Sequence, residues 1–322
     1  MLQLHYSWNV VEPALNFKTE VSGIELRGWL PDNPVAVSPE ILSAIRTKKV
    51  PKPLSVGMIS FQHCPTRRDL YFSVKESREG DQTWGRIAGR LAERFLGNLV
   101  ADRFNRKLSS RQKSYPAVRG VIERRLRKFI NERKDDFALL DKYKTTAVGN
   151  RSFFGTILCN AAIHELASQE LDFTLRAATE RRSQPKETEL TPAEHLGLSK
   201  KNTPDFIFPS LRAVGDMKTG RELEEYHLLT CAGYALAYES QEKKPIDFGI
   251  VYFFPTQRSA VSFAQVYLFV IDDQLRRRFL LLRNSAYTTL LEKNAPPLPE
   301  DKSRCPTCKF LSVCQDQGLK IT

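Results

Sequence analysis

Hydrophobic residues recur every three to four positions in several stretches of the chain, which is the spacing of one face of an α-helix. The clearest stretch runs from Thr83 to Val100, where the apolar positions are Trp84, Ile87, Leu91, Phe95 and Leu99. The same spacing predicts helices over residues 155–181 and 222–239. These helices are long enough to cover a sheet.

Shorter stretches rich in β-branched and aromatic residues predict strands instead of helices. The four predicted strands are Pro204–Phe208, Arg212–Lys218, Asp247–Phe254 and Phe263–Ile271. The last strand leads into a helix that runs to about Lys293, with Asp272 or Asp273 as its N-cap. Because helices and strands alternate over residues 155–293, the predicted fold class is α/β or α+β, with one mixed central sheet flanked by helices.

Changes in composition divide the chain into four segments. Residues 1–54 form a turn-rich N-terminal extension, in which the alternating positions 23–30 predict a strand. Residues 55–150 contain a cysteine and a basic helical insertion. Residues 151–294 carry the predicted sheet, and residues 295–322 form a Pro-rich end with three further cysteines. The predicted core therefore lies between two cysteine-bearing segments.

The overall composition is that of an ordinary globular protein, with 41% hydrophobic and 27% charged residues in 322. The longest mostly apolar window, Ala260–Ile271, is too short to span a bilayer, and the chain does not begin with a basic and apolar leader. We therefore expect a cytoplasmic protein with no membrane association. Reducing conditions there favour metal ligation over disulfides, and Cys159 and Cys231, within apolar helical patterns, are expected to be buried core thiols.

Positive charge is concentrated in one part of the chain. The net charge is +12, and residues 103–134 hold twelve Lys or Arg against two Glu. Within that segment, apolar positions alternate with basic ones at helical spacing, so one helical face can pack while the other stays basic. A phosphate backbone is the natural partner of such a face, whereas the alternative is a solvated helix that only keeps the protein soluble.

Four cysteines are spaced like the ligands of an inorganic centre. Cys305, Cys308 and Cys314 form a C-x2-C-x5-C run, and Cys64 lies far upstream in the sequence Cys-Pro-Thr-Arg-Arg. Thiolates in this pattern suit a [4Fe–4S] cluster, provided that the chain folds Cys64 back onto its C-terminal end. Zinc is the alternative, although zinc sites usually pair two C-x2-C runs, and unliganded thiols are the third reading.

Two acidic residues and a lysine lie on the first two predicted strands. Asp205 begins the first strand, and Asp216 and Lys218 lie on one face of the second because side chains alternate across a strand. Two carboxylates on a hairpin form a hard-oxygen site for Mg²⁺ or Mn²⁺, with the backbone carbonyl of Met217 as a further ligand. The lysine can position or deprotonate a water, or offset charge on a phosphoryl oxygen, which is the equipment for hydrolysing a phosphodiester.

Two further features extend this site. His164, on the predicted helix before the strands, is a plausible additional metal ligand or else a hydrogen-bonded structural residue. His227, Thr230 and Tyr234 share one face of the helix after Lys218. That polar row can face the metal and a nucleic-acid backbone, and the alternative is a partly exposed face with Tyr234 packed in the core.

Taken together, these residues resemble the CRISPR-associated RecB-like iron–sulfur nucleases of the PD-(D/E)XK superfamily. That family has an early cysteine, a helical histidine, an acid on one strand, an E-x-K or D-x-K on the next, a helix with Q-x-x-x-Y, and a terminal C-x2-C-x5-C. The matching residues here are, in order, Cys64, His164, Asp205, Asp216, Lys218, Tyr234, Cys305, Cys308 and Cys314. The length fits best a longer archaeal variant tied to type I-A CRISPR loci.

The resemblance implies a fold, an activity and roles for these residues. It implies a restriction-endonuclease-like sheet, and a metal-dependent DNA exonuclease that trims fragments before CRISPR integrase proteins insert them as spacers. The metal ligands would be His164, Asp205 and Asp216, with Lys218 catalytic and Tyr234 assisting substrate positioning. The four cysteines would bind a structural [4Fe–4S] cluster. Asp216 replaces the commoner glutamate, and Thr230 stands where the family has glutamine.

Two other functions fit the same residues. The first is a non-catalytic iron–sulfur scaffold that binds DNA in the integration complex, which the missing glutamine favours. The second is the nuclease module of a recombination or repair helicase. The chain contains no G-x4-G-K-[ST] phosphate loop, so the motor would be another subunit.

Overall fold

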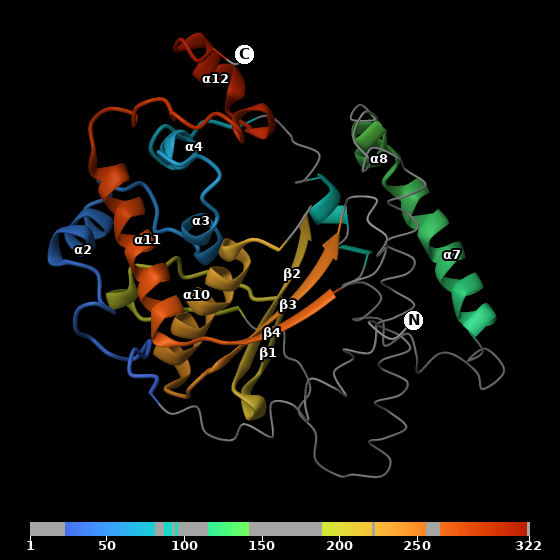
Figure 1. Ribbon diagram of the computed structural model, residues 1–322, viewed down its shortest axis with the longest axis horizontal. Coiled ribbons are helices and arrows are strands. Elements are labelled where there is room, and N and C mark those ends of the chain that lie inside the picture. Colours follow the sequence, from blue (N-terminus) through green and yellow to red (C-terminus); the bar gives the residue numbers. More distant parts are fainter. Residues whose placement is uncertain are drawn as a thin grey trace.

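The computed structural model describes residues 23–80, 87–91, 94–95, 115–141, 189–220, 223–255 and 265–320. A four-stranded sheet lies at its centre, and helices pack against it (Figure 1). The strands are β1 (Phe206–Phe208), β2 (Ala213–Gly220), β3 (Phe248–Pro255) and β4 (Gln265–Val270). All four predicted strands are therefore confirmed, with ends that differ from the predicted ones by a few residues at most.

The sheet is mixed, as the sequence predicts, with the strands in the order β1-β2-β3-β4. β1 and β2 form an antiparallel hairpin in which Phe206 pairs with Gly215, and β3 and β4 are also antiparallel. β2 and β3 run parallel, so the chain must cross over between them, and helix α10 (Glu225–Glu242) makes that crossover. This arrangement places the first turn of α10 directly after the residues of β2.

Helices α10 and α11 pack against each other beside the sheet. α11 (Asp273–Leu291) begins as predicted, because the Asp272 side chain accepts a hydrogen bond of 2.8 Å from the N–H of Leu275. The remaining described helices are α2 (Pro39–Arg46), α3 (Val56–Ser60), α4 (Arg68–Leu70), the π-helix η1 (Tyr71–Lys75), α7 (Tyr115–Glu132), α8 (Lys134–Asp141), the short 3₁₀ turns at Glu194–Leu196, Pro209–Leu211 and Cys305–Thr307, and α12 (Leu311–Asp316).

The two faces of the sheet contribute to two hydrophobic clusters. Ile207, Val214 and Val251 belong to the main core, together with the buried face of α10. Phe208 and Ile250, one position away along their strands, belong to a cluster on the opposite face. The alternation of strand side chains thus decides which residues face α10. Asp216 and Lys218 follow Val214 at intervals of two, so they also face α10.

The expected strand at residues 23–30 is wrong. Residues 24–27 have no regular secondary structure, residues 28–29 form a turn, and none of them pairs with a strand of the described chain. The N–H groups of Glu25 and Leu26 donate instead to the Asp273 carboxylate, at 2.9 and 2.8 Å. A Cβ at position 28 would come within 1.9 Å of the Leu236 carbonyl oxygen of α10, so only glycine allows this close approach. Side chains of two helices thus replace a neighbouring strand as the partners of this backbone.

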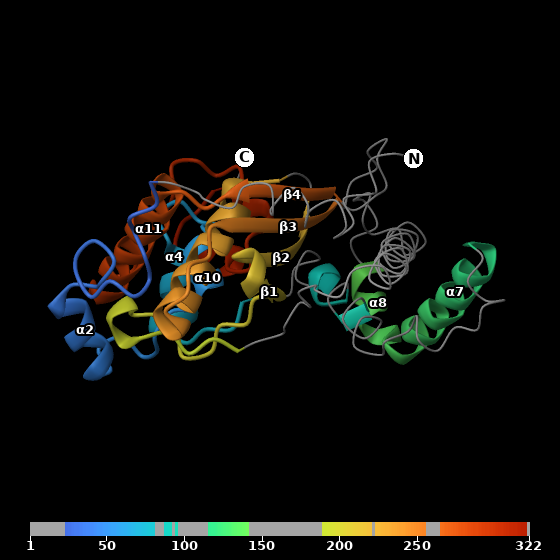
Figure 2. The same cartoon turned by 90° about the horizontal axis from the view of Figure 1, so that it is seen from below.

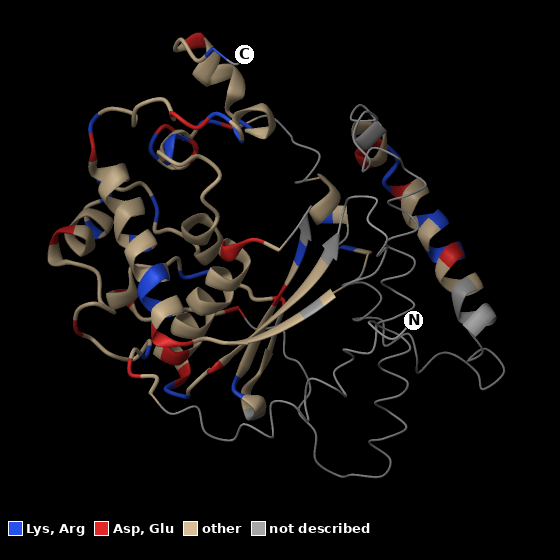
Figure 3. Ribbon diagram, in the orientation of Figure 1, with Lys and Arg blue, Asp and Glu red and all other residues tan. Residues whose placement is uncertain are grey.

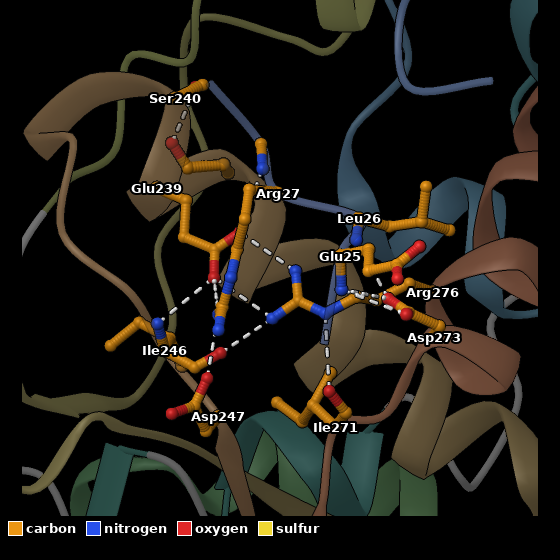
Figure 4. A network of polar contacts seen from close by, with 12 residues as sticks. Glu25, Leu26, Arg27, Glu239, Ser240, Ile246, Asp247, Ile271, Asp273 and Arg276 are labelled. Carbon is orange, nitrogen blue, oxygen red and sulfur yellow. Dashed lines mark hydrogen bonds and ion pairs between the residues drawn. The ribbon is translucent and has the colours of Figure 1, made fainter. Parts of the chain in front are cut away.

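A buried ionic network joins the same N-terminal segment to the core (Figure 4). Glu239 of α10 is fully buried and accepts from Arg27 at 2.8 Å and from Arg276 at 2.8 and 3.0 Å. It also accepts from the N–H of Gly28 at 2.8 Å. Arg27 reaches the buried Asp247 as well, at 2.7 Å. Each buried charge therefore has a partner of opposite sign, without which its burial would be costly.

Helices α7 and α8 stand apart from the sheet in both views (Figures 1 and 2). The predicted amphipathic helix is confirmed in α7, where Ile122, Leu126 and Phe129 are buried while Arg124, Arg127 and Lys128 are exposed. The Phe129 ring lies 5.3 Å from that of Phe95 and 6.2 Å from that of Phe137. The described residues of the predicted 83–100 helix, including Phe95, are helical. No helix in the described part of the chain is long and apolar enough to cross a bilayer.

Candidate functional site

The β1–β2 hairpin brings the predicted acidic residues together. Asp205 immediately precedes β1, and its carboxylate accepts a hydrogen bond from the backbone N–H of Met217 on β2. Asp216 and Lys218 form an ion pair on the face of β2 that points towards α10. In Figure 3, acidic and basic positions of β2 lie near the acidic start of α10. His164 lies outside the described residues, so its position relative to this group stays a prediction.

Burial gives this acidic group unusual electrostatics. Asp216 is only 4% exposed, and its Oδ2 atom has no hydrogen bond besides the ion pair with Lys218. Burial lowers the pKa of Lys218, but the carboxylates of Asp216 and Asp205 outweigh that effect and raise the net pKa above its usual value. Lys218 is therefore a cation at neutral pH. A buried carboxylate oxygen with spare acceptor capacity suits a divalent cation.

The first turns of α10 bring His227, a member of the predicted polar row, together with Glu224, which the sequence did not single out for this site. Glu224 and His227 form a reciprocal cap, in which the N–H of Glu224 donates to His227 Nδ1 at 2.9 Å. Burial and the neighbouring Lys218 charge lower the pKa of His227 to about 3, so the ring is neutral. Its other nitrogen, Nε2, is buried and has no hydrogen-bond partner. An acid followed three residues later by a histidine at the start of a helix is the sequence pattern that could have predicted this cap.

The other two members of the predicted polar row have different surroundings. Thr230 is buried, its hydroxyl lies 2.8 Å from that of Ser60 on α3, and it also donates to the carbonyl of Tyr226 at 2.8 Å. Thr230 therefore joins α10 to α3. Tyr234 is half-buried and packs against the main core. Cys231, on the same helix, is a fully buried core thiol as predicted, whereas Cys159 lies outside the described residues.

The four spaced cysteines line one pocket. Cys64, Cys305 and Cys314 are each at most 9% exposed, and Cys308 is partly exposed. The side chains that line this pocket include all four cysteines, Cys64, Cys305, Cys308 and Cys314. Although Cys64 precedes Cys305 by more than two hundred residues, the fold brings both to the same cavity. Four ligands of one inorganic centre would have to meet in this way.

Local turns and a long-range clamp build this pocket. The chain turns at Cys305, whose carbonyl accepts from the N–H of Cys308 at 2.9 Å. The Arg68 side chain, from α4 just after Cys64, donates to the carbonyl of Pro296 and to the side chain of Gln317. Tyr71 donates to the carbonyl of Lys293 at 2.7 Å. The helix after Cys64 thereby holds the C-terminal segment in place.

The pocket disfavours free thiolates. Burial raises the pKa of Cys305, and the neighbouring sulfurs of Cys64 and Cys314 add to that effect. Burial, reinforced by the same two sulfurs and by Asp69, raises the pKa of Cys308 to about 11. Thiolates gathered here would need a cationic centre to offset their charge, and the predicted cluster stays a prediction. In the described part of the chain, no three His, Cys, Asp or Glu side chains are grouped so that they could hold a metal ion as they stand.

One ion pair joins the cysteine pocket to the acidic hairpin. Arg304, the residue before Cys305, donates to the Glu224 carboxylate at 2.7 Å. Glu224 in turn caps α10 together with His227, which lies close enough to Lys218 for the lysine charge to lower the histidine pKa. The two groups of predicted site residues are therefore connected through the start of α10.

Comparison with known proteins gives the chain a family. A family model described as "CRISPR-associated exonuclease Csa1" matches residues 14–317. A curated protein of Saccharolobus solfataricus with the same description is 37% identical over 121 residues, which is 37% of this chain and 39% of that protein. The chain is thus aligned with about two fifths of the length of that relative.

A solved structure, described as the crystal structure of SSO0001, is a much weaker match. It is 13% identical, covers 58% of this chain and 82% of its own chain, and superposes with a TM-score of 0.27. A score this low does not establish a common fold. The family model, by contrast, covers nearly the whole sequence. The chain belongs to the family of CRISPR-associated exonucleases described as Csa1.

Proposed function

We propose that the protein is a divalent-metal-dependent DNA exonuclease that processes fragments for CRISPR spacer acquisition. The observation that carries the proposal is the buried Asp216–Lys218 pair, with Asp205 beside it, on the hairpin that faces α10. The printed description of the family supports an exonuclease. The mixed sheet, with an acid before β1 and an acid and a lysine on β2, is also the arrangement expected of the PD-(D/E)XK nucleases.

The chain's own residues divide the work of hydrolysis. Asp205, Asp216, the Met217 carbonyl and His164 would hold Mn²⁺ or Mg²⁺, which supplies an activated water and offsets charge on the phosphoryl group. Lys218, which pairs with Asp216 on the same face of β2, would stabilise negative charge on a phosphoryl oxygen or position the attacking water. Tyr234 would help to position the substrate strand.

The experiment that tests this function is a cleavage assay on the full-length protein. End-labelled single-stranded, blunt and frayed duplex DNA are incubated with Mn²⁺, and products are followed over time. We expect shortening from the ends, fastest on single-stranded or frayed substrates. Binding to all three substrates without any cleavage would favour the non-catalytic scaffold instead. Co-purification with CRISPR integrase proteins would support the role in spacer acquisition, whereas co-purification with an ATPase would favour a helicase module.

The cysteine pocket is expected to hold a structural [4Fe–4S] cluster. We predict that anaerobically purified protein is coloured and contains about four iron and four sulfide per chain. Replacing Cys305 and Cys314 with serine should remove the iron and lower the Tm, since the free energy of binding such a centre contributes to folding. Iron, sulfide and zinc analysis together with a thermal unfolding curve measure both effects.

The matched control for this prediction is Cys231→Ala, which removes a buried thiol outside the pocket. It should leave the iron content unchanged. If the wild-type protein contains zinc and no iron, the pocket holds the alternative zinc centre and not a cluster. Metal-free protein that remains fully folded with all four pocket cysteines changed to serine would show that no inorganic centre is needed.

The exposed basic face of α7 is expected to bind DNA phosphates. We predict that replacing Arg124, Arg127 and Lys128 with glutamine weakens DNA binding. The slope of log affinity against log salt concentration should become less steep by about 3, which is about one for each lost phosphate contact. Fluorescence anisotropy over a salt series measures the slope. The control replaces three other exposed basic residues, Arg277 and Arg278 of α11 and Lys293 just after that helix. An unchanged slope in the α7 variant would contradict this role.

A further inference from the structure

Phe61 is an exposed aromatic residue next to the acidic hairpin. Among the residues that the structure describes, the large hydrophobic side chains that stay exposed are Phe61, Leu268, Leu281 and Leu291. Phe61 is the aromatic one, and it is 45% exposed. Exposing a phenyl ring to water is unfavourable. An aromatic residue that remains accessible beside a reactive site is therefore a candidate for contact with a ligand.

Phe61 belongs to a small aromatic cluster. Its ring centroid lies 4.9 Å from that of Tyr226 at an interplanar angle of 71°, and 5.7 Å from that of His63 at 37°. Neither neighbour stacks parallel to Phe61. The two contacts therefore hold the ring in place and leave part of it accessible.

The cluster lies beside the residues proposed for hydrolysis. Phe61 follows α3 directly, and α3 packs against α10, whose first turn carries Tyr226 (Figure 1). Burial raises the pKa of the Tyr226 hydroxyl, and the carboxylates of Glu224 and Asp216 add to that effect. The Tyr226 ring centroid lies 4.0 Å from that of His227, which lies 5.7 Å from that of Phe253 on β3. Phe253 pairs with Lys218 of β2, so the aromatic cluster borders the acidic hairpin.

The loop that carries Phe61 is fixed from its other side by the C-terminal segment. His63 Nε2 lies 2.9 Å from the carbonyl oxygen of Arg304, and the Arg304 guanidinium contacts the carbonyl of Gln62 at 3.4 Å. The same guanidinium binds Glu224, two residues before Tyr226, at 2.7 Å. The ring is therefore held in position before any ligand arrives, which lowers the entropic cost of binding.

We propose that Phe61, supported by Tyr226 and His63, is a stacking site for an unpaired nucleobase of the DNA strand that enters the acidic hairpin. This inference rests on the proposed nuclease function and adds the substrate feature that the site recognises. Every base offers a flat π face, so stacking tolerates any sequence. Bases inside a duplex are already stacked on each other, which makes the site selective for frayed or single-stranded ends.

The test compares bases with bare phosphates. A duplex with a four-nucleotide overhang is compared with one whose overhang is abasic, for both 5′ and 3′ overhangs, in buffer without Mn²⁺ so that the DNA stays intact. Fluorescence anisotropy gives the affinities. We expect wild-type protein to bind the normal overhang about 5- to 150-fold more tightly than the abasic one, which is the range for stacking on one aromatic side chain.

Three variants complete the design. Phe61→Ala should bind both overhangs alike, Phe61→Trp should keep the preference, and Leu281→Ala, which removes an exposed side chain of α11, should behave as wild type. Circular dichroism and Tm confirm that each variant is folded. A preference that persists in Phe61→Ala, or wild-type protein that shows none, would overturn the inference.

The cleavage assay with Mn²⁺ separates this inference from the proposed function. If wild-type protein prefers the normal overhang through Phe61 but cleaves nothing, the stacking site stands and the nuclease function falls. If it cleaves DNA and does not distinguish the overhangs, the nuclease function stands and the stacking site falls.

Discussion

Asp216→Asn should lower the rate of Mn²⁺-dependent DNA cleavage by at least about 1,000-fold, because it removes a metal-binding charge and a partner of Lys218 together. The asparagine has nearly the same shape, so DNA binding should change little. Lys218→Met should have a comparable effect, since it removes the cation that offsets charge on the phosphoryl oxygen. Single-turnover cleavage of end-labelled DNA measures the rate, and anisotropy without Mn²⁺ measures binding.

The double variant distinguishes loss of chemistry from loss of folding. Asp216→Asn alone leaves the largely buried Lys218 cation without its ion-pair partner, which costs stability. Combining it with Lys218→Met removes both charges, so we expect the Tm to recover partly while cleavage stays absent. Glu242→Gln, an exposed acid at the end of α10, is the control and should cleave normally. Cleavage by the double variant at the wild-type rate would exclude this hairpin as the catalytic site.

Glu239→Gln should destabilise the protein by about 3–5 kcal/mol, because it leaves two buried arginines with too little negative charge. Arg276 is fully buried and Arg27 is 8% exposed, and both bind the Glu239 carboxylate. If the 322 residues unfold as one unit, such a change corresponds to a fall in Tm of roughly 4–7 °C. Thermal and denaturant unfolding, followed by circular dichroism, measure the loss.

The control for this prediction is an exposed pair with the same chemistry and the same bond length. Glu194 and Arg46 are 2.8 Å apart, but their side chains are 57% and 59% exposed. Glu194→Gln should therefore cost no more than about 1 kcal/mol. Equal effects of the two substitutions would show that burial does not set the strength of the Glu239 network. Folded Glu239→Gln protein should cleave DNA at the normal rate, since the contacts of Glu239 described above do not include a residue of the acidic hairpin.

The sequence predicted the parts of the fold that depend on neighbours along the chain. Periodicity located the four strands and the helices α10 and α11, and Asp272 is the N-cap that its position before α11 predicts. Alternation also placed Asp216 and Lys218 on one face of β2, where they form an ion pair. These features follow from local geometry, because a strand repeats every two residues and a helix every 3.6.

Contacts between distant segments could not be obtained in that way. The alternation at residues 23–30 predicted a strand, but the partners of that backbone are the side chains of Glu239 and Asp273, more than two hundred residues later. Phe61 and Tyr226 meet only because α3 packs against α10. No periodicity carries that information, since it depends on which faces of the elements are buried together.

The sequence alone thus determined the order of the strands and helices, the acidic hairpin and the terminal C-x2-C-x5-C run, because each is a pattern of spacing within one segment. The tertiary structure decided that the four cysteines line one pocket, that Arg304 joins this pocket to the start of α10, and that an aromatic cluster borders the acidic hairpin. The physical reason is that these contacts arise from the packing of the core, which brings residues together regardless of their separation along the chain.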